Sequence, residues 1–394
     1  MKEVEKYLFS LEKKGIILGP ERTSALLDIC GKPHQKLKIL QVLGTNGKGS
    51  TSAILFKILQ LNGMSVGLYT SPHLKSFKER IRVNGKTISD KHVHEFINTY
   101  KKDIDRLEAS FFEVLTVMSV WVFKKLKLDY VILETGLGGR LDSVTSCKAQ
   151  SFAITSISMD HNHILGETLE KIAVEKISAI SKKSKVYISD QNNHINDLIK
   201  RECVNKQCKY SFVKTNSKLD VSLKGEHQMQ NASLAVEIAK DMGCRNTIIN
   251  KALKKVKWYG RNQVISKSPD IIFDVAHNEE GVTSFLKYLN TLNKKYDRKY
   301  LLLSLQNKKN IKKCIPIIEK EFDKIIYSKT DQLKSMDFDV IKRVFKKEVL
   351  FKKPKEAIGF ALNISNKKDL IAIIGTHYWG NDISDIFNIY FDII

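Results

Sequence analysis

Short apolar runs alternate with helical hydrophobic patterns through the first half of the chain. The runs predict strands, because each is bounded by polar or glycine-rich turns and is too short for a helix. Apolar residues spaced three and four apart predict the helices between them. Strands are expected at 38–43, 66–70, 129–133, 152–157 and 185–189, and helices at 2–14, 24–29, 90–101, 111–126 and 169–182, with a further helix that Gly63 closes.

This alternation predicts an α/β fold: an N-terminal, P-loop-type, doubly wound and mostly parallel sheet with ligands beyond the carboxyl ends of its strands. A strand at 219–226 and a helix at 227–242 follow. The alternation then restarts, which predicts a smaller C-terminal Rossmann-like α/β domain and domain limits of 1–262 and 263–394. Its expected strands are 271–274, 300–303, 324–327 and 370–374, and its expected helices are 281–292 and 311–321.

Length and composition fit two globular domains. The chain has 394 residues, of which 42% are hydrophobic and 28% charged, enough for two cores. No apolar run reaches the roughly 18 residues of a membrane helix, and residues 1–15 are too charged for a signal peptide. We therefore expect a cytoplasmic protein with no membrane partner. The six cysteines lack paired short spacings, so free thiols are expected.

The net charge of +23 raises the question of a polyanionic partner. The lysines are scattered along the chain, and no zinc-finger, basic-zipper or RNP pattern accompanies them. We expect no nucleic-acid partner and a lysine-rich solvated surface, whose field helps to attract anionic substrates such as nucleotides.

The run GTNGKGS at 44–50 follows an expected strand and opens a helical pattern. A glycine-rich turn points successive backbone N–H groups at one place, and the helix adds the positive end of its dipole. Lys48 supplies a point charge for a β- or γ-phosphate. The strict Walker pattern requires Gly at 42 and Ser or Thr at 49, where this chain has Val42 and Gly49. A turn that only links strand to helix stays an alternative.

Three polar residues, Ser71, Glu134 and His161, lie at or just after the carboxyl ends of expected strands. They share the sheet edge with the glycine-rich loop, and oxygen ligands there suit Mg²⁺. Each also has a simpler interpretation. Ser71 precedes Pro72 in a turn, Glu134 suits a cap or an ion pair, and His161 competes with His163 or lies on the surface.

Lys176 falls on the apolar stripe of its expected helix, within about 20° of Leu169. Burial of a lysine is unfavourable unless it is paired or modified, and desolvation makes its neutral amine available for reaction with CO₂. A snorkelling or ion-paired lysine is the alternative. Asn231 also lies on the apolar side of its helix, as a satisfied core amide or a ligand contact.

With these motifs, the chain resembles the folylpolyglutamate synthase and dihydrofolate synthase group of the Mur ligase superfamily. The similarity runs from about residue 10 to 280 and is carried by GTNGKGST (44–51), TSPHL (70–74), ERIRVNG (79–85), FFE (111–113), ILETGLGGRLD (132–142), DHNHILGETLEKIAVEK (160–176), HQMQNA (227–232), GR (260–261) and DVAHN (274–278). GKGS, where cell-wall Mur ligases tend to have GKTS, favours the folate branch.

The resemblance implies a nucleotide and metal site with two Mg²⁺ ions. Ser71 and Glu134 would bind one Mg²⁺ and His161 the second, and Lys176 matches the family's N6-carboxylysine. Lys48, Lys176 and His161 would be catalytic. The residues implied in ATP binding are Thr45, Asn46, Gly47, Lys48, Gly49, Ser50, Asn231, Arg261, Asp274 and His277.

The resemblance also implies a folate or dihydropteroate site. Its residues would be Ile16, Ile17, Leu18, Gly19, Arg80, Ser110, Phe111, Phe112, Glu113, Leu141, Asp142 and Ser143. The family's acidic DKD stretch is here 308–310, with the sequence Lys-Lys-Asn, so no details of its glutamate site are carried over.

The implied reaction activates a carboxylate. The γ-phosphoryl group of ATP passes to a dihydropteroate or reduced folate carboxylate, and the amino group of L-glutamate attacks the acyl phosphate. We expect a monomer whose domains close, hinged near 258–263, because an acyl phosphate hydrolyses in water. Two alternatives are a Mur-type amide ligase for a cell-wall or peptide substrate and a basic, nucleotide-gated nucleic-acid binder.

Overall fold

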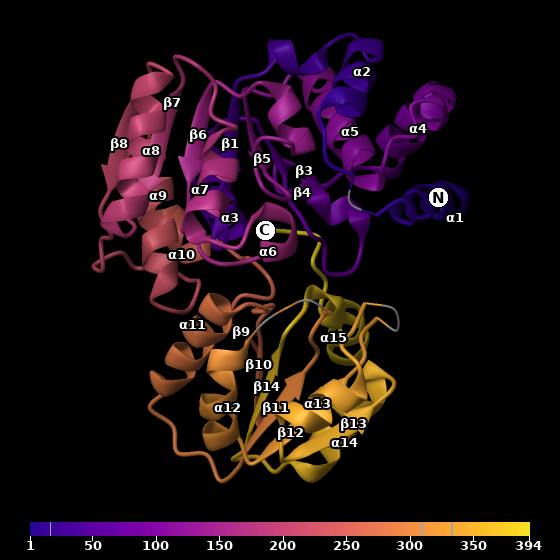
Figure 1. Ribbon diagram of the computed structural model, residues 1–394, viewed down its shortest axis with the longest axis vertical. Helices are drawn as coiled ribbons and strands as arrows, with labels where there is room; N and C mark the ends of the chain where they lie inside the picture. Colours follow the sequence, from indigo (N-terminus) through magenta and orange to yellow (C-terminus); the bar gives the residue numbers. More distant parts are fainter. Residues whose placement is uncertain (16, 308, 310, 332–333) are drawn as a thin grey trace.

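Two β-sheets, one above the other in Figure 1, organise the chain. The computed structural model describes residues 1–394 except 16, 308, 310 and 332–333. The first sheet has eight strands and the second has six. The predicted α/β class with mostly parallel sheets is confirmed.

The first sheet has the order β4-β3-β2-β5-β1-β6-β7-β8. Only β3 and β4 pair antiparallel to their neighbours. After β1 the chain continues to β2 and β5 on one side of β1, and it later crosses to β6, β7 and β8 on the other side. The strand order therefore reverses at β1. The strands are β1 (Ile39–Leu43), β2 (Val66–Tyr69), β3 (Ile81–Val83), β4 (Lys86–Thr87), β5 (Tyr130–Glu134), β6 (Ser151–Ile154), β7 (Lys185–Ser189) and β8 (Lys209–Val213).

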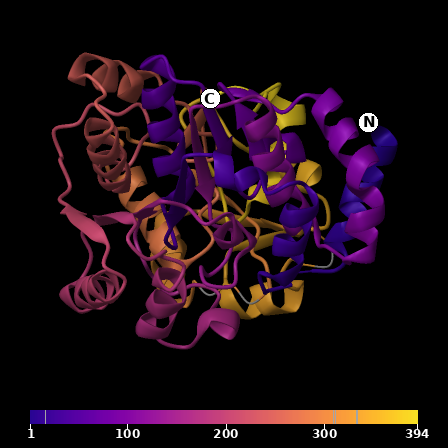
Figure 2. The ribbon, with the colours of Figure 1, turned by 90° about the horizontal axis from the view of Figure 1, so that it is seen from above.

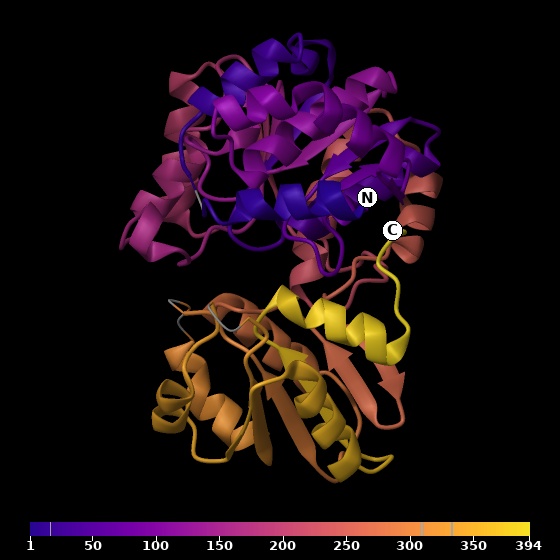
Figure 3. The same cartoon turned by 90° about the vertical axis from the view of Figure 1, so that its right-hand side faces the viewer.

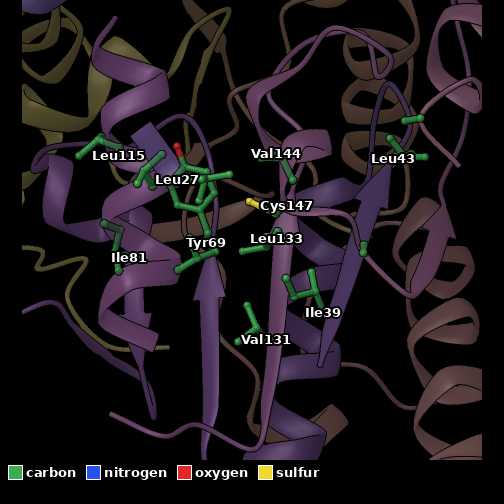
Figure 4. Packing of buried hydrophobic residues seen from close by; sticks show 14 of the residues in the cluster. Leu27, Ile39, Leu43, Tyr69, Ile81, Leu115, Val131, Leu133, Val144 and Cys147 are labelled. Atoms are coloured by element: carbon green, nitrogen blue, oxygen red, sulfur yellow. The ribbon is translucent and has the colours of Figure 1, made fainter. Parts of the chain in front are cut away.

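Helices cover both faces of this sheet, because apolar side chains point to both sides of its buried strands. Ile39 and Leu43 of β1 pack on one face, whereas Leu40 and Val42 pack on the other. The first face, part of which Figure 4 shows, is covered by α1 (Lys2–Glu12), α2 (Glu21–Ile29), α4 (Asp90–Arg106), α5 (Phe111–Lys125), α7 (Leu169–Ile177) and α8 (Asn193–Asn205). The second face is covered by α3 (Lys48–Leu61), α9 (His227–Asp241) and α10 (Asn246–Lys255). Seen from above, α1 and α8 lie at opposite ends of the sheet (Figure 2).

The second sheet has the order β13-β12-β11-β14-β10-β9, with β9 antiparallel. Its strands are β9 (Gln263–Lys267), β10 (Asp270–Phe273), β11 (Lys299–Leu303), β12 (Lys324–Ser328), β13 (Glu348–Phe351) and β14 (Leu370–Ile374). One face carries α11 (Glu279–Asn290), α12 (Ile315–Glu321) and α13 (Phe338–Val344), and the other carries α14 (Pro354–Ile364) and α15 (Gly380–Phe387). Short helices elsewhere are α6 (Asn162–Leu165), η1 (Pro33–Lys36), η2 (Phe77–Arg80), η3 (Ser143–Cys147), η4 (Lys312–Cys314) and η5 (His377–Trp379).

The prediction of a strand at 219–226 is wrong, and the edge strand β8 was missed. Val221 and Leu223 are buried against the helices on the second face of the first sheet without pairing in a ladder. Their alternation with polar residues therefore reflects burial of a loop, not a strand. The helix expected at 169–182 ends at Ile177. All six cysteines are free thiols, as expected. Across the described residues, no helix has the length and apolar character needed to cross a membrane.

Residues 389–394 return from α15 to the first sheet (Figure 3). Ile393 forms an antiparallel bridge with Lys86, and Ile394 is buried in the core on the second face. Arg82 of β3 is 2% exposed and donates to the carbonyl oxygens of Phe391 at 2.6 Å and Asp392 at 2.5 Å. This segment is a second chain connection between the sheets.

We predict that Arg82→Ala lowers the free energy of unfolding by about 1–3 kcal/mol, because it leaves buried carbonyl oxygens without a donor. The measurement is urea unfolding followed by circular dichroism. Arg106→Ala is the control, because the Arg106 side chain is 66% exposed and its ion pair is with Asp103, three residues away. Equal midpoints for the two variants would show that the Arg82 contacts do not stabilise the fold.

Candidate functional site

The parallel register brings four loops to one edge of the first sheet. Val42 of β1 lies opposite Glu134 of β5, and Leu43 lies opposite Ile154 of β6. The strands therefore end at the same level, and the polar residues that follow them converge. This edge faces the second sheet, since Asn278 donates to Asp160 across the gap at 3.1 Å.

The glycine-rich loop has the geometry of a phosphate cradle. It follows β1, and Gly47, in the left-handed conformation with φ 86°, precedes α3. A Cβ on Gly47 would lie 2.1 Å from Asn231 Oδ1, and a Cβ on Gly44 would lie 1.9 Å from Thr155 Oγ1. Glycine is therefore required at both positions, by backbone conformation and by space.

Polar side chains follow this loop at the start of α3. Lys48 Nζ donates to the carbonyl oxygens of Thr45 at 2.9 Å and Gly44 at 3.2 Å, and burial lowers its pKa against the opposing charge of Glu134. The hydroxyl groups of Ser50, Thr51 and Ser52 are buried without a hydrogen-bond partner among the described residues. Consecutive helical residues point in different directions, so these three hydroxyl groups do not converge on one ligand. Lys48 is the side chain of this helix start that contacts the loop, and its ammonium group suits a bound phosphate.

Ser71 and Glu134 come together as predicted. The Ser71 backbone N–H donates to Glu134 Oε2 at 3.0 Å. Glu134 is 4% exposed, and burial raises its pKa against the lowering effect of Lys48. A buried carboxylate beside a serine and the phosphate loop fits a Mg²⁺ ion that completes its shell with water and phosphate oxygens. The described residues contain no group of three or more His, Cys, Asp or Glu side chains arranged for a metal.

His161 lies farther along the same edge, and its ring nitrogen faces a lysine. Lys309, from the loop after β11, has its Nζ 3.2 Å from His161 Nε2 and 2.7 Å from Asp160 Oδ1. Burial and the Lys309 charge lower the pKa of His161 to about 4. In this arrangement Nε2 is not free to bind a metal ion, because the Lys309 ammonium group occupies that side of the ring. A metal ligand role would require Lys309 to move.

Lys176 lies on the buried face of α7, as its periodicity predicts, at 4% exposure. Its Nζ donates to the Gly44 carbonyl oxygen at 2.9 Å, so both Lys48 and Lys176 contact the same loop carbonyl. Burial, followed by the Lys48 charge, lowers the pKa of Lys176 to about 7. Gly139, in the loop after β5, lies against the backbone of α7. A Cβ at this position would lie 2.4 Å from the Lys176 carbonyl oxygen, so glycine is needed there.

The other residues expected at the nucleotide lie around this loop and at the junction between the sheets. Asn231 Nδ2 donates to Gln228 Oε1 at 3.0 Å, and its Oδ1 is the atom that faces Gly47. Asp274 accepts the backbone N–H groups of Asn262 and Ala276, both at 2.7 Å. Burial raises the pKa of Asp274, and the nearby Arg261 charge partly opposes this rise. His277 Nε2 lies 3.6 Å from Asp160 Oδ2.

The segments expected at the folate site also meet. The Gly19 backbone N–H donates to the Leu141 carbonyl oxygen at 3.1 Å. Arg80 lies over the Phe111 ring at 5.1 Å, and the Phe112 ring fills the space that a side chain at Gly136 would need. Ile17 is half-buried and Leu18 exposed, whereas Ile16 lies outside the described residues.

Several of these polar residues have structural partners. Ser110 and Glu113 form the capping box of α5, and Glu113 also pairs with Arg22 at 3.0 Å. Asp142 accepts the backbone N–H groups of Leu137 and Val144, and Ser143 Oγ accepts a hydrogen bond from Thr23 Oγ1. Burial raises the pKa of Asp142 to about 6.

Sequence reasoning missed the residues that contact this edge from the second sheet, Glu280 and Lys309. Glu280 accepts from Ser158 Oγ at 2.7 Å and from Asn46 Nδ2 in the phosphate loop. Glu280 follows the DVAHN motif by two residues, which was the only signal for it.

Curated relatives support a ligase. No protein-family model matches the chain. It is 35% identical over 308 residues to the dihydrofolate synthase/folylpolyglutamate synthase of Bacillus subtilis, covering 68% of this chain and 71% of that protein. It is 27% identical over 379 residues to a Haloferax volcanii protein named "Probable bifunctional folylpolyglutamate synthase/dihydropteroate synthase". That match covers 88% of this chain but only 45% of the Haloferax protein.

Solved structures agree over nearly the whole chain. E. coli FolC in complex with DHPP and ADP is 25% identical, with a TM-score of 0.87 over 98% of this chain and 97% of that one. A bifunctional folylpolyglutamate synthase/dihydrofolate synthase with Mn, AMPPNP and L-glutamate bound is also 25% identical, with a TM-score of 0.86 over 98% of both chains. The chain therefore belongs to the dihydrofolate synthase/folylpolyglutamate synthase family of ATP-dependent, glutamate-adding ligases with the Mur ligase fold.

Proposed function

We propose that this protein uses ATP to add L-glutamate to the carboxylate of dihydropteroate, of a reduced folate, or of both. The observation that carries the proposal is that Lys48 and Lys176 both donate hydrogen bonds to the Gly44 carbonyl oxygen of the phosphate loop. A buried lysine at a glycine-rich loop suits a strongly anionic ligand, because burial of its charge is unfavourable without an opposite charge nearby. The ligands bound in the two solved structures, ADP in one and AMPPNP with L-glutamate in the other, support the choice of ATP and glutamate.

The residues of the chain position a phosphoryl transfer. The loop 44–50 holds the ATP phosphates through backbone N–H groups, and Lys48 turns from the loop carbonyls to the transferred phosphoryl group. The substrate carboxylate then becomes an acyl phosphate. The glutamate amine attacks its carbonyl carbon, phosphate leaves, and an amide bond results. The facing second sheet excludes water from this intermediate.

Ser71 and Glu134 would hold a divalent cation, whose charge stabilises negative charge developing on the phosphate oxygens. A second cation, which the family resemblance implies, would use His161 once Lys309 has left its ring nitrogen. Lys176 would carry a carboxylate on Nζ, formed by its neutral amine and CO₂. The added negative charge then compensates the surplus positive charge at the loop.

We assign the remaining site residues by the same logic. Asn231 contacts the nucleotide from α9 beside Gly47, and Arg261, Asp274 and His277 contact it from the junction of the sheets. The segments around Gly19, Arg80, Phe111 and Leu141 bind the folate. We divide the chain into domains 1–262 and 263–394, supported by β8, which ends the first sheet at Val213, and β9, which begins the second at Gln263. We propose that the protein acts as a monomer.

The substrate is tested by ADP release from the purified chain with ATP, Mg²⁺ and L-glutamate. We expect glutamate-dependent ADP release with dihydropteroate, with tetrahydrofolate or with both. A UDP-muramoyl peptide is the control substrate, and we expect no release with it. Release with the muramoyl peptide alone would contradict the folate assignment.

The Lys176 carboxylate is tested with ¹³C-labelled bicarbonate. Because the pKa of Lys176 is about 7, the neutral amine rises from about one-tenth of the population at pH 6 to about nine-tenths at pH 8. The carbamate ¹³C resonance should grow over the same interval. It should be absent in Lys176→Ala, whose kcat should fall by about a hundredfold or more and recover in part with added short carboxylic acids.

Lys171→Ala is the matched control for this experiment, because Lys171 is an exposed lysine of the same helix. It should retain both the resonance and the activity. A Lys176→Ala variant with full activity would contradict the assignment.

We predict that Glu134→Gln raises the Mg²⁺ concentration for half-maximal activity about tenfold or more, because it removes the charged ligand of the cation. Glu170→Gln, on the exposed start of α7, is the control and should titrate like the unsubstituted chain. The measurement is initial rate against free Mg²⁺ at saturating ATP. An unchanged titration for Glu134→Gln would rule out this ligand.

A further inference from the structure

Glu280 brings a carboxylate from the second sheet to the phosphate loop. It lies in the first turn of α11 beside a second acidic residue, Glu279. Its Oε2 accepts from Ser158 Oγ at 2.7 Å, from Ser156 Oγ at 3.5 Å and from Asn46 Nδ2. Asn46 belongs to the loop itself, between Thr45 and Gly47. The contact thus joins the second sheet directly to the loop.

The donors around Glu280 are neutral. They are two hydroxyl groups and one amide, and no lysine or arginine among the described residues forms an ion pair with this carboxylate. Its negative charge is therefore held next to the loop by hydrogen bonds from neutral donors. Charges at a protein surface interact through an effective dielectric constant below that of bulk water, so this carboxylate and bound phosphate groups would repel each other.

We propose that Glu280 is a positioning residue that weakens nucleotide binding through Asn46 and so promotes release of ADP in each catalytic cycle. This inference rests on the proposed function in one respect, that a nucleotide binds at 44–50. The nucleotide phosphates bind to a loop whose Asn46 side chain already donates a hydrogen bond to the Glu280 carboxylate. The hydrogen bonds to Glu280 and the bound phosphates then oppose each other, so the affinity for nucleotide is set below what the loop alone would give.

The test is calorimetric titration of ADP with Mg²⁺ into the full chain. Glu280→Gln keeps the size and an acceptor for Asn46 but removes the charge, so its Kd for ADP should be about threefold to tenfold lower than that of the unsubstituted chain. Glu280→Ala removes both charge and contact and should also bind more tightly. Because Glu280 is exposed, both variants are expected to fold, which circular dichroism checks.

Glu279→Gln is a matched control. Glu279 lies in the same first turn of α11 and so has the same relation to the helix dipole. Its carboxylate instead accepts the Lys313 backbone N–H at 3.3 Å and lies 3.4 Å from Lys313 Nζ. The Kd of this variant should remain unchanged.

Two further readouts separate electrostatics from a structural role. The difference in Kd between Glu280→Gln and the unsubstituted chain should shrink as salt rises, because exposed charges are screened. KM for ATP should fall in Glu280→Gln.

An equal or higher Kd for Glu280→Gln, with ADP still bound by the unsubstituted chain, would overturn this inference alone. Weaker binding in Glu280→Ala would also overturn it, because it would indicate that the contact supports the nucleotide-binding form of the loop. Absence of ADP binding by the unsubstituted chain would instead overturn the proposed function and this inference with it.

Discussion

The site depends on the desolvation of like charges around one carbonyl group. Lys48 and Lys176 both donate to the Gly44 carbonyl oxygen. The Glu134 carboxylate favours the charged form of Lys48, and Asp160 favours the charged form of both lysines. Two ammonium groups in a buried site are unfavourable unless additional negative charge is present. The packing of the fold therefore holds these two lysines close to one loop carbonyl at an unfavourable electrostatic free energy. The same desolvation brings the pKa of Lys176 to about 7, into the range where its amine reacts.

The sheet holds this unfavourable cluster in place. The core on both faces of β1 fixes the strand register, and the register fixes the loops at one edge. Glycine at 44 and 47 then lets the loop pass against Thr155 and Asn231 without a side chain between them. Rigid packing of this kind stabilises the geometry against the repulsion of its charges.

The second sheet completes the site from the opposite side. Residues 274–280 and Lys309 reach the edge of the first sheet, where they meet Asn46, Ser158 and Asp160. Nearly all these contacts are polar. The chain connects the two sheets at two places, just before β9 and through residues 389–394. Polar contacts of this type resemble those between domains that move relative to each other, whereas a large apolar interface would hold the two sheets rigidly together.

The sequence by itself determined the elements and the local chemistry. Hydrophobic periodicity predicted the alternating fold and put Lys176 on a buried helix face, and the spacing of glycine and lysine predicted a phosphate loop. The fold class and the burial of Lys176 are confirmed, because each depends on residues within about one helix or one turn. The phosphate loop stays a prediction. Only the tertiary structure decided what lies between segments far apart in the chain. It turned His161 toward Lys309, left 219–226 as a loop that buries only Val221 and Leu223, and brought Glu280 to Asn46. Those contacts follow from the packing of one sheet against the other, which no local pattern encodes.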